Sequence, residues 1–479
     1  MRRVLRRTTW AAVLFVVLLP AARLWACYAV VVGRQASADG SVLVGHNEEN
    51  GGRRVLLFRV VPAREFAAGA VARLRRGGTL PQVPKTCSYL WSEIPGLEFS
   101  DAYLNQHGVA VVSDACPTRE EGYEALVARG EIRHGGIGYM LRRLVAERAR
   151  SARHGVELAG GLIERFGYVA SGRTYVIADP REAWLVAVVR GRRWVAQRVP
   201  DDRVVLLPNV HIIDRVDLGD RHNFMASPDI VSYAVARGWY DPASDGPFRF
   251  APVYGDPSRE RPDLRRLRGR QRISGRAEEP TPNGLLHFGV RPSRPVTVAD
   301  VARVLRDRRS RRPISSPWVQ EGAVFQLRDG MPRWLGCIYW RATAEPATSV
   351  FTPWYLGILE TPPAYDHPAA RQAPFDLQHH FHPSPQLLAE DPRMAWWIFK
   401  GLQDRVHEDL PGRLQTVASR WAEMEQLLLE RQASVEERAR ELARNDPPAA
   451  RRYLTRYCAQ AAAEACEQAR RLSDLLAGR

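Results

Sequence analysis

Lysine is almost absent from this chain of 479 residues, because Lys85 and Lys400 are its only lysines. Arginine therefore supplies nearly all of the positive charge, and the formal net charge is +16 at pH 7. Such one-sided usage along the whole chain is typical of a coding bias. The densest clusters, Arg259–Arg272 and Arg306–Arg312, also lack the interleaved aromatic side chains of a single-strand-binding groove. We therefore expect solvated loops and helix faces and no nucleic-acid partner, with weak binding to anionic envelope surfaces left open.

Long apolar runs are absent beyond the N-terminus. There, TTWAAVLFVVLLPAA follows the basic MRRVLRR and precedes LWA, which is the three-part pattern of a secretory signal. The run is short for a membrane span, and Pro20 and Arg23 interrupt its far end. We predict that residues 1–26 are a leader that is removed on export, so that no stable membrane span remains. The mature protein is then periplasmic or extracellular, with envelope association open. The alternative is an uncleaved N-terminal anchor helix.

Metal-type ligand spacing is also absent. The run His379–His382 holds three histidines in a proline-bounded segment without an acidic residue at ligand spacing, so we expect a surface loop there. No phosphate-binding glycine loop and no G-x-S-x-G elbow occurs. The six cysteines also lack a metal-type spacing: Cys27, Cys87, Cys116, Cys337, Cys458 and Cys466. We therefore expect neither a metal nor an organic cofactor.

Two strand-like runs follow the expected leader, CYAVVVGRQAS and GSVLVGHNEE. Asp39–Gly40 between them is a strong signal for a two-residue hairpin turn. The runs should then pair antiparallel, with residue 27 opposite about residue 52.

The rest of the chain alternates between strand and helix patterns. Residues 135–167 predict two amphipathic helices, residues 173–209 predict strands, and the segment from about 242 to 295 reads as a loop. Strand signals return near GAVFQLR, RWLGCIYWRAT and SVFTPWYLGI, and the chain is helical from about Asp391, with a break at NDPPAA. We expect an α+β body of layered sheets over residues 27–390, with residues 391–479 as a helical region packed on the same domain.

Cys27 directly follows the expected cleavage point. Cleavage after Ala26 would give Cys27 a free α-amine, whose pKa of about 8 lets it accept the thiol proton. A thiolate is a strong nucleophile for acyl transfer, so Cys27 would carry nucleophile and base together, and the leader would block it. Two alternatives stay open: LWAC also resembles a lipoprotein cleavage box, and Cys27 could be a buried cysteine of a first strand.

The stretch from Cys27 to Asn50 resembles the N-terminal motif of the bacterial dipeptidase and secernin-like family of N-terminal-nucleophile cysteine hydrolases. LNQHGVAVVSDA, YVIADPREAWLVAVV, WVAQRVPDD and LLPNVHIID follow in the family's order, and the resemblance spans nearly the whole mature chain. It implies a four-layer αββα sandwich with a helical C-terminal extension, and hydrolysis of small peptides, with a dipeptidase expected. An amidase or acylase for other linear amides, and a non-catalytic lipidated envelope protein that binds peptides, are the alternatives. A homo-oligomer stays open.

The resemblance also assigns site residues. Cys27 matches the nucleophile, and Asn209 in LLPN matches an asparagine whose amide helps hold the oxyanion, a donor worth roughly 3–4 kcal/mol of barrier. A second donor is expected from backbone near Ala115. The family's arginine and aspartate on the second strand read His46 and Glu49 here. Glutamate could supply the carboxylate through its longer side chain, but a histidine with a pKa of about 6.5 is not permanently charged. Asn47 and Glu48 are alternatives for the same work.

Overall fold

The computed structural model describes residues 27–51, 53–259, 263–277, 286–309, 311–371 and 376–478. The expected leader, residues 1–26, lies outside the described residues. Across the described ranges, no helix combines the length and the apolar character that a membrane crossing requires.

The N-terminal strands belong to a six-stranded antiparallel sheet, in which β1 lies between the edge strand and β2. Its order is β12 (Val204–Leu207), β1 (Tyr28–Val32), β2 (Val42–Glu49), β14 (Val319–Leu327), β15 (Cys337–Thr343) and β16 (Phe351–Tyr355). Every residue of β1 and β2 is buried, because both faces of the sheet are covered.

An eight-stranded antiparallel sheet faces the first. Its order is β13 (Phe224–Ala226), β11 (Trp194–Arg198), β10 (Ala183–Gly191), β9 (Tyr168–Ala178), β8 (Ala110–Ala115), β7 (Ala102–Asn105), β6 (Tyr89–Glu93) and β3 (Leu57–Val61). Outside it, β4 (Val71–Arg73) and β5 (Thr79–Pro81) form a separate two-stranded hairpin. Val31 and Val44 from one sheet and Val112 and Val176 from the other share one apolar core, and His46 on the same face of β2 reaches Asp114 on β8, so the sheets pack face to face.

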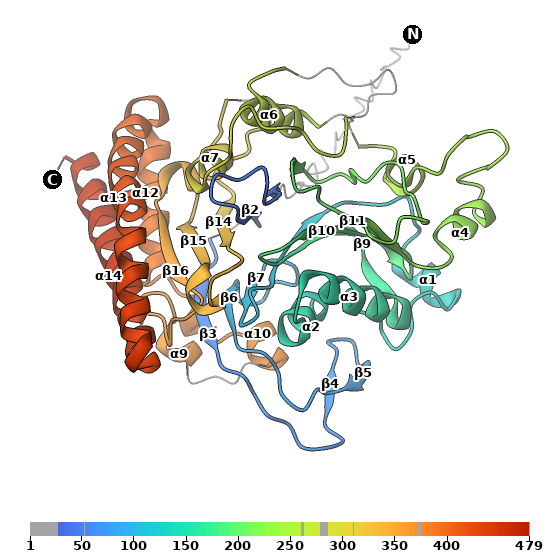
Figure 1. Ribbon diagram of the computed structural model, residues 1–479, viewed down its shortest axis with the longest axis horizontal. Coiled ribbons are helices and arrows are strands. Elements are labelled where there is room, and N and C mark those ends of the chain that lie inside the picture. Colours follow the sequence, from blue (N-terminus) through green and yellow to red (C-terminus); the bar gives the residue numbers. More distant parts are fainter. Residues whose placement is uncertain are drawn as a thin grey trace, which may run out of the picture.

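Helices cover both outer faces of this pair of sheets (Figure 1). The six-stranded sheet is covered by α7 (Val298–Leu305), α12 (Ala395–Glu408), α13 (Leu410–Asn445) and α14 (Pro447–Leu476). The eight-stranded sheet is covered by α2 (Met140–Arg148) and α3 (Ala152–Phe166). The predicted αββα sandwich is confirmed, and the C-terminal helices form one of its layers.

The connections contain further short helices. These are α1 (Tyr123–Ala128), α4 (Ile230–Ala236), α5 (Phe250–Tyr254), α6 (Leu264–Ser274), α8 (Arg333–Gly336), the 3-10 helix η1 (Pro346–Thr348), α9 (Pro368–Arg371), α10 (Leu377–Phe381) and α11 (Pro385–Leu388). The two helices expected within residues 135–167 and the helical C-terminus are confirmed. The predicted break lies between α13 and α14, where Asp446 caps the start of α14.

The connection between β1 and β2 differs from the predicted hairpin. Tyr28 pairs with Asn47 and Val32 with Leu43, so residue 27 lies opposite residue 48, and the predicted pairing with residue 52 is wrong. β1 already ends at Val32 and β2 begins only at Val42. The longer loop persists because its backbone finds partners outside the hairpin: Gly33 N donates to Arg203 O at 2.9 Å and Ala38 N to Val296 O at 2.9 Å.

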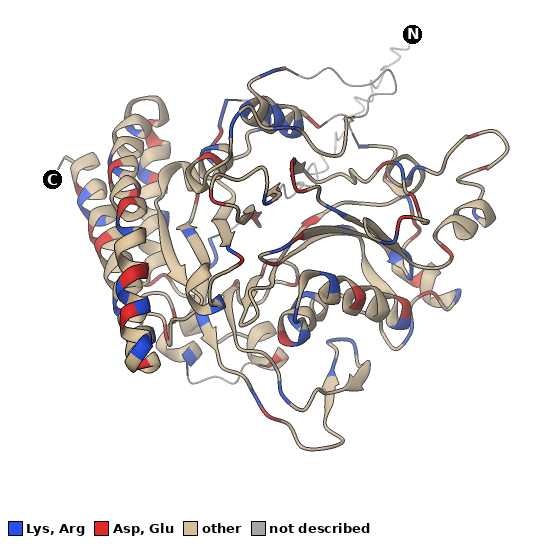
Figure 2. Cartoon of the chain, viewed as in Figure 1, with Lys and Arg blue, Asp and Glu red and all other residues tan. Residues whose placement is uncertain are grey.

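The arginine cluster Arg259–Arg272 also departs from expectation. Part of the predicted loop is α6, which crosses the top of the molecule in Figure 1 and is densely basic in Figure 2. Arg265, Arg266 and Arg270 of this helix are buried, so the expectation of solvated side chains is wrong for them. The helix packs against β12, so its buried arginines can contact residues of the six-stranded sheet.

Candidate active site

Cys27 directly precedes β1, between two neighbouring strands of the six-stranded sheet. The β1–β2 ladder places residue 48 opposite it on one side, and the pairing of Ala29 with Leu207 places residue 209 opposite it on the other. Its side chain is only 4% exposed. The fold thus brings together Cys27, Asn209 and the end of β2, as the resemblance implied.

Glu48, and not Glu49, places its carboxylate beside the thiol. Cys27 Sγ lies 3.4 Å from Glu48 Oε1, whereas Glu49 Oε1 accepts a hydrogen bond from Ser316 Oγ at 2.8 Å. Glu49 contacts the sulfur through its backbone: its N–H donates to Sγ at 3.5 Å, and its carbonyl oxygen accepts from Sγ at 3.8 Å. The difference follows from the register, because side chains of a strand alternate between its faces and residue 48 lies opposite Cys27. The structure therefore corrects the expected Glu49 carboxylate contact to Glu48.

His46 shares the face of β2 that carries Glu48 and contacts the second sheet. Its Nε2 lies 3.0 Å from Asp114 Oδ1 on β8, and both side chains are fully buried. Burial lowers the pKa of His46, but the hydrogen bond to Asp114 and the charges of Asp114 and Glu48 outweigh it and raise the pKa above 6.5. The pair thus favours a charged imidazole. Sequence reasoning missed Asp114, although an aspartate inside the apolar strand AVVSDA was a signal.

Asn209 is held by two partners that fix the direction of its amide. Its Nδ2 donates to Ala115 O at 3.0 Å, and its Oδ1 accepts from Arg265 Nη2 at 3.0 Å. Because guanidinium only donates and carbonyl oxygen only accepts, the amide has a single orientation. Nδ2 carries a second N–H that can serve an oxyanion.

Arg265 links Asn209 to the nucleophile. Its Nη1 donates to Cys27 O at 3.2 Å, while Nη2 holds Asn209. This residue was missed because it lies within the arginine cluster that we expected to be solvated.

The surroundings of Cys27 disfavour its thiolate in a chain that still carries the preceding residues. Burial and the negative charges of Glu48 and Asp114 raise the pKa of the Cys27 thiol well above its usual range, although the Glu49 N–H and the charge of Arg173 oppose them. A nearby positive charge would be needed to make this sulfur reactive.

Two groups of side chains bear on metal binding. One donor atom each of Cys27, His46 and Glu48 lies within 4.8 Å of the others, and these are donor types that zinc accepts. The His379–His382 run offers no comparable set: His380 contacts Glu93 Oε1 and Leu97 O, both at 2.9 Å, and His379 contacts Asp376 Oδ1 at 2.8 Å. His380 is buried in α10, so the expected surface loop is wrong for that residue.

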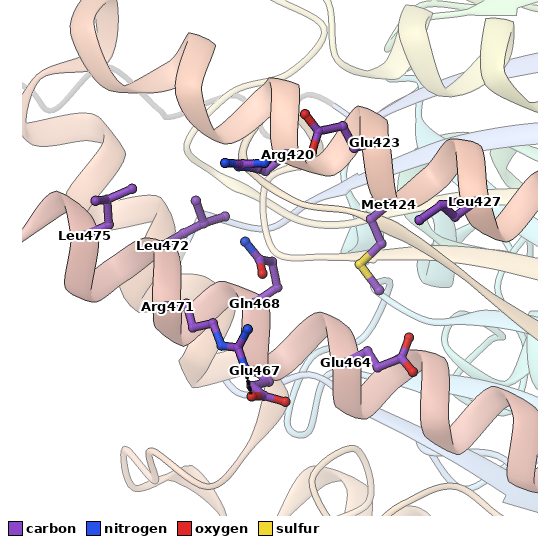
Figure 3. Close-up of a pocket in the computed structure, with 10 residues that line it drawn as sticks. All are labelled: Arg420, Glu423, Met424, Leu427, Glu464, Glu467, Gln468, Arg471, Leu472 and Leu475. Atoms are coloured by element: carbon purple, nitrogen blue, oxygen red, sulfur yellow. Dashed lines mark hydrogen bonds and ion pairs between the residues drawn. The ribbon is translucent and has the colours of Figure 1, made fainter.

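A groove of about 510 Å³ runs between α13 and α14 (Figure 3). Its lining comes only from those two helices: Arg420, Glu423, Met424, Leu427, Glu464, Glu467, Gln468, Arg471, Leu472 and Leu475. None of these residues belongs to the strands around Cys27, so the groove is not part of this site.

Comparison with known proteins gives the family. Residues 26–382 match the sequence profile of peptidase family C69. The chain belongs to this family. It is therefore a hydrolase that acts on peptide bonds, and the resemblance seen in the sequence is confirmed.

Its relatives carry matching descriptions. A probable dipeptidase of Salmonella dublin is 28% identical over 375 residues, which cover 73% of this chain and 86% of the relative. A dipeptidase of Bifidobacterium longum is 27% identical over 398 residues, with 71% and 72% covered. Among solved structures, the penicillin V acylase of Agrobacterium tumefaciens is similar at 11% identity and a TM-score of 0.33, with 69% of this chain and 86% of the acylase covered.

Proposed function

We propose that this C69 peptidase is an exported dipeptidase in which Cys27, freed by removal of residues 1–26, is an N-terminal nucleophile. The observation that carries the proposal is the position of Cys27, opposite Glu48 on one neighbouring strand and Asn209 on the other, with Sγ 3.4 Å from Glu48 Oε1. The nucleophile and the nitrogen that becomes the α-amine then belong to the same residue. The descriptions of the relatives as dipeptidases support the substrate class.

The chemistry proceeds through a thioester. The α-amine of Cys27 takes the thiol proton, and Sγ attacks the carbonyl carbon of the peptide bond. The oxyanion receives a hydrogen bond from the second N–H of Asn209 Nδ2. Collapse breaks the C–N bond, and the α-ammonium returns the proton to the leaving amine. Water, deprotonated by the same amine, then releases the acyl group and regenerates the thiol.

The charges around Cys27 suit these steps. The Glu48 carboxylate, 3.4 Å from the sulfur, stabilises the α-ammonium that forms on attack. The same carboxylate and Asp114 raise the pKa of the thiol while no ammonium is present. A leader attached to Cys27 converts its nitrogen into an amide, which has no basic lone pair, so the precursor lacks both the base and the compensating charge. The leader thus acts as a block.

N-terminal sequencing and intact mass of the mature protein test the proposal. We expect a chain that begins at Cys27 with a free amine and hydrolyses dipeptides, and Cys27→Ala should abolish hydrolysis while the Tm stays within a few degrees. A mature enzyme that starts elsewhere overturns the mechanism. A thioether-linked lipid with an acylated amine favours a non-catalytic envelope protein, and hydrolysis of acyl-amino acids but not dipeptides favours an amidase.

A further inference from the structure

Two arginines beside the candidate active site are buried without a carboxylate partner. Arg142 on α2 is 1% exposed and Arg173 on β9 is 7% exposed. Within the described residues, Arg142 Nη1 donates to Asp101 O, and Arg173 Nη1 donates to Ser113 O at 3.3 Å and to Ser113 Oγ at 3.1 Å. Arg142 Nη2 and Arg173 Nε are buried there without a hydrogen-bond partner, and neither guanidinium forms an ion pair.

The two guanidinium groups are anchored on opposite edges of a gap in the eight-stranded sheet. β7 begins at Ala102, and its pairing of Tyr103 with Val111 places Ala102 beside Val112. The last residues of β8, up to Ala115, therefore have no β7 neighbour. Arg142 bonds the backbone of Asp101 at the near edge of this gap, and Arg173 bonds Ser113 at its far edge.

The gap lies next to the nucleophile. Arg173 pairs with Ala115 in the β8–β9 ladder, and Ala115 O accepts the hydrogen bond from Asn209. Burial raises the pKa of both Cys27 and Glu48; the positive charge of Arg173 opposes this at both groups, and that of Arg142 opposes it at Glu48. Arg173 thus lies beside the strand that holds Asn209, and the charge of Arg142 reaches Glu48 beside the sulfur.

Buried charges are costly unless an opposite charge compensates them. The neighbouring carboxylates Glu48, Asp101 and Asp114 interact with these arginines through their charges alone. Their hydrogen bonds go elsewhere: Glu48 contacts Cys27 and Asn50, Asp101 accepts from Tyr103, and Asp114 contacts His46, and none joins a carboxylate to either guanidinium within the described residues. The bare N–H groups of both arginines therefore remain for an anion from outside. Arginine is the side chain best matched to a carboxylate.

We propose that Arg142 and Arg173 bind the free C-terminal carboxylate of the peptide substrate. The proposal rests on Cys27 as the nucleophile. In a dipeptide the carboxylate carbon lies at most roughly 4 Å from the carbonyl carbon that is attacked, as standard bond lengths dictate. In a longer peptide cleaved at its first bond, the carboxylate lies at least one residue further away. A fixed pair of arginines beside the sulfur therefore selects dipeptides by their length.

The experiment compares one dipeptide as the free acid and as the C-terminal amide. Wild-type enzyme should hydrolyse the acid with a kcat/KM at least about 30-fold higher, the effect of one charge-assisted hydrogen bond. Arg142→Met and Arg173→Met should each lower kcat/KM for the acid by at least about 30-fold, mainly through KM, and change that for the amide less than about threefold. Arg148→Met, on the same helix and bonded to Gln82, is the matched control and should change neither. Equal wild-type rates for acid and amide, or variants that lose both substrates in parallel, overturn the proposal.

Binding to Cys27→Ala separates this proposal from the dipeptidase mechanism. Calorimetry should detect the free dipeptide and show at least about 30-fold weaker binding of its amide, even if turnover follows another mechanism. Equal affinities for the acid and the amide would overturn the carboxylate site and leave the role of Cys27 unaffected. Wild-type protein that binds the acid but does not hydrolyse it would overturn the dipeptidase mechanism and support the carboxylate site. This measurement also decides the matter where an arginine variant does not fold.

Discussion

At the scale of single residues, the neighbours Glu48 and Glu49 have separate tasks. Glu48 lies against the thiol, while Glu49 accepts from Ser316 on the other side of the strand. Family resemblance pointed to Glu49, because it aligns sequence positions and does not measure where a side chain points. One residue of register decides which of two adjacent carboxylates meets the sulfur.

The charge of Glu48 predicts a shift in thiol reactivity. Because this charge raises the pKa of Cys27, Glu48→Gln should lower that pKa. In the mature enzyme, the rise of the iodoacetamide reaction rate with pH should move to lower pH, while kcat falls at least about tenfold for loss of the ammonium's partner. Glu49→Gln is the control, since it keeps the backbone N–H that bonds Sγ, and its alkylation profile should match the wild type. Identical pH dependences of the alkylation rate in the wild type and both variants would show that Glu48 does not act on the thiol.

The His46–Asp114 pair predicts that the pKa of His46 depends on the charge of Asp114. Burial lowers the pKa of His46, and the hydrogen bond and charge of Asp114, with the charge of Glu48, reverse this. Asp114→Asn should therefore lower the pKa of His46 relative to the wild type. Histidine-selective NMR titration measures it, with the other ring signals as reference. An unchanged pKa in Asp114→Asn would mean that Asp114 does not hold the charge.

At the scale of elements, α7 is held at its start by a reciprocal cap. Thr297 Oγ1 accepts from Asp300 N at 3.2 Å, and Asp300 Oδ2 accepts from Thr297 N at 3.1 Å. This helix covers β2 and β14, and Asn47 Nδ2 donates to Leu305 O at its C-terminal end at 2.9 Å. The cap thus steadies an element that backs the strand carrying His46 and Glu48.

Removing the charge of this cap should cost stability in a pH-dependent way. Burial raises the pKa of Asp300, but hydrogen bonds from Arg294, Thr297 and Arg303 outweigh it and lower the pKa to about 2. The stabilisation is therefore complete above the unfolded-state pKa of about 3.9 and is lost as pH falls towards about 2. Asp300→Asn should lower the free energy of unfolding by about 1–2 kcal/mol at pH 7. Thermal unfolding from pH 7 to 3 should show a constant difference in stability between wild type and Asp300→Asn, which narrows only below about pH 4. A difference that changes between pH 5 and 7 would contradict this assignment.

Most elements were predictable because their signals are local. The alternation in residues 173–209 and the long polar–apolar period after Asp391 depend on neighbouring residues only. The β1–β2 connection was not predictable in the same way. Its loop bonds to Arg203 and Val296, partners that no local pattern contains, and they override the turn preference of Asp39–Gly40.

The same distinction holds for the site. Cys27 and Asn209 could be found because their motifs are contiguous in the sequence. Asp114, Arg265, Arg142 and Arg173 could not be assigned roles, because each acts through contacts with strands or helices far away in the chain. The burial of individual arginines in the two clusters was the hardest feature to predict, because the sequence does not distinguish a buried guanidinium from a solvated one.

At the scale of the whole molecule, a buried ion pair within the six-stranded sheet also contacts the second sheet. Arg341 on β15 pairs with Glu321 on β14, and Glu321 Oε2 accepts from Ser92 Oγ of the opposite sheet at 2.8 Å. Arg341 and Glu321 are at most 2% exposed. The Ser92–Glu321 hydrogen bond thus joins the two sheets, as the His46–Asp114 contact does.

Breaking this pair should destabilise the entire fold. Glu321→Gln leaves the charge of Arg341 buried without compensation, so the free energy of unfolding should fall by about 3–5 kcal/mol. Glu65→Gln is the control, because its pair with Lys85 is solvent-exposed and should contribute about 0–1 kcal/mol. Denaturant unfolding of the three proteins measures both effects. A loss below about 1 kcal/mol for Glu321→Gln would show that the buried pair does not stabilise the fold.

The internal position of β1 in its sheet bears on when residues 1–26 could be removed. Cys27 adjoins a strand with hydrogen-bonded neighbours on both sides, and it is almost fully buried. A processing peptidase has to grip the chain around the bond it cuts in an extended, accessible form, which this packed position does not offer. If residues 1–26 are removed as we propose, cleavage before Cys27 must precede the closing of the sheet. Under that proposal, precursor that folds first would keep its blocked nitrogen and remain inactive, so the relative rates of cleavage and folding would set the yield of active enzyme.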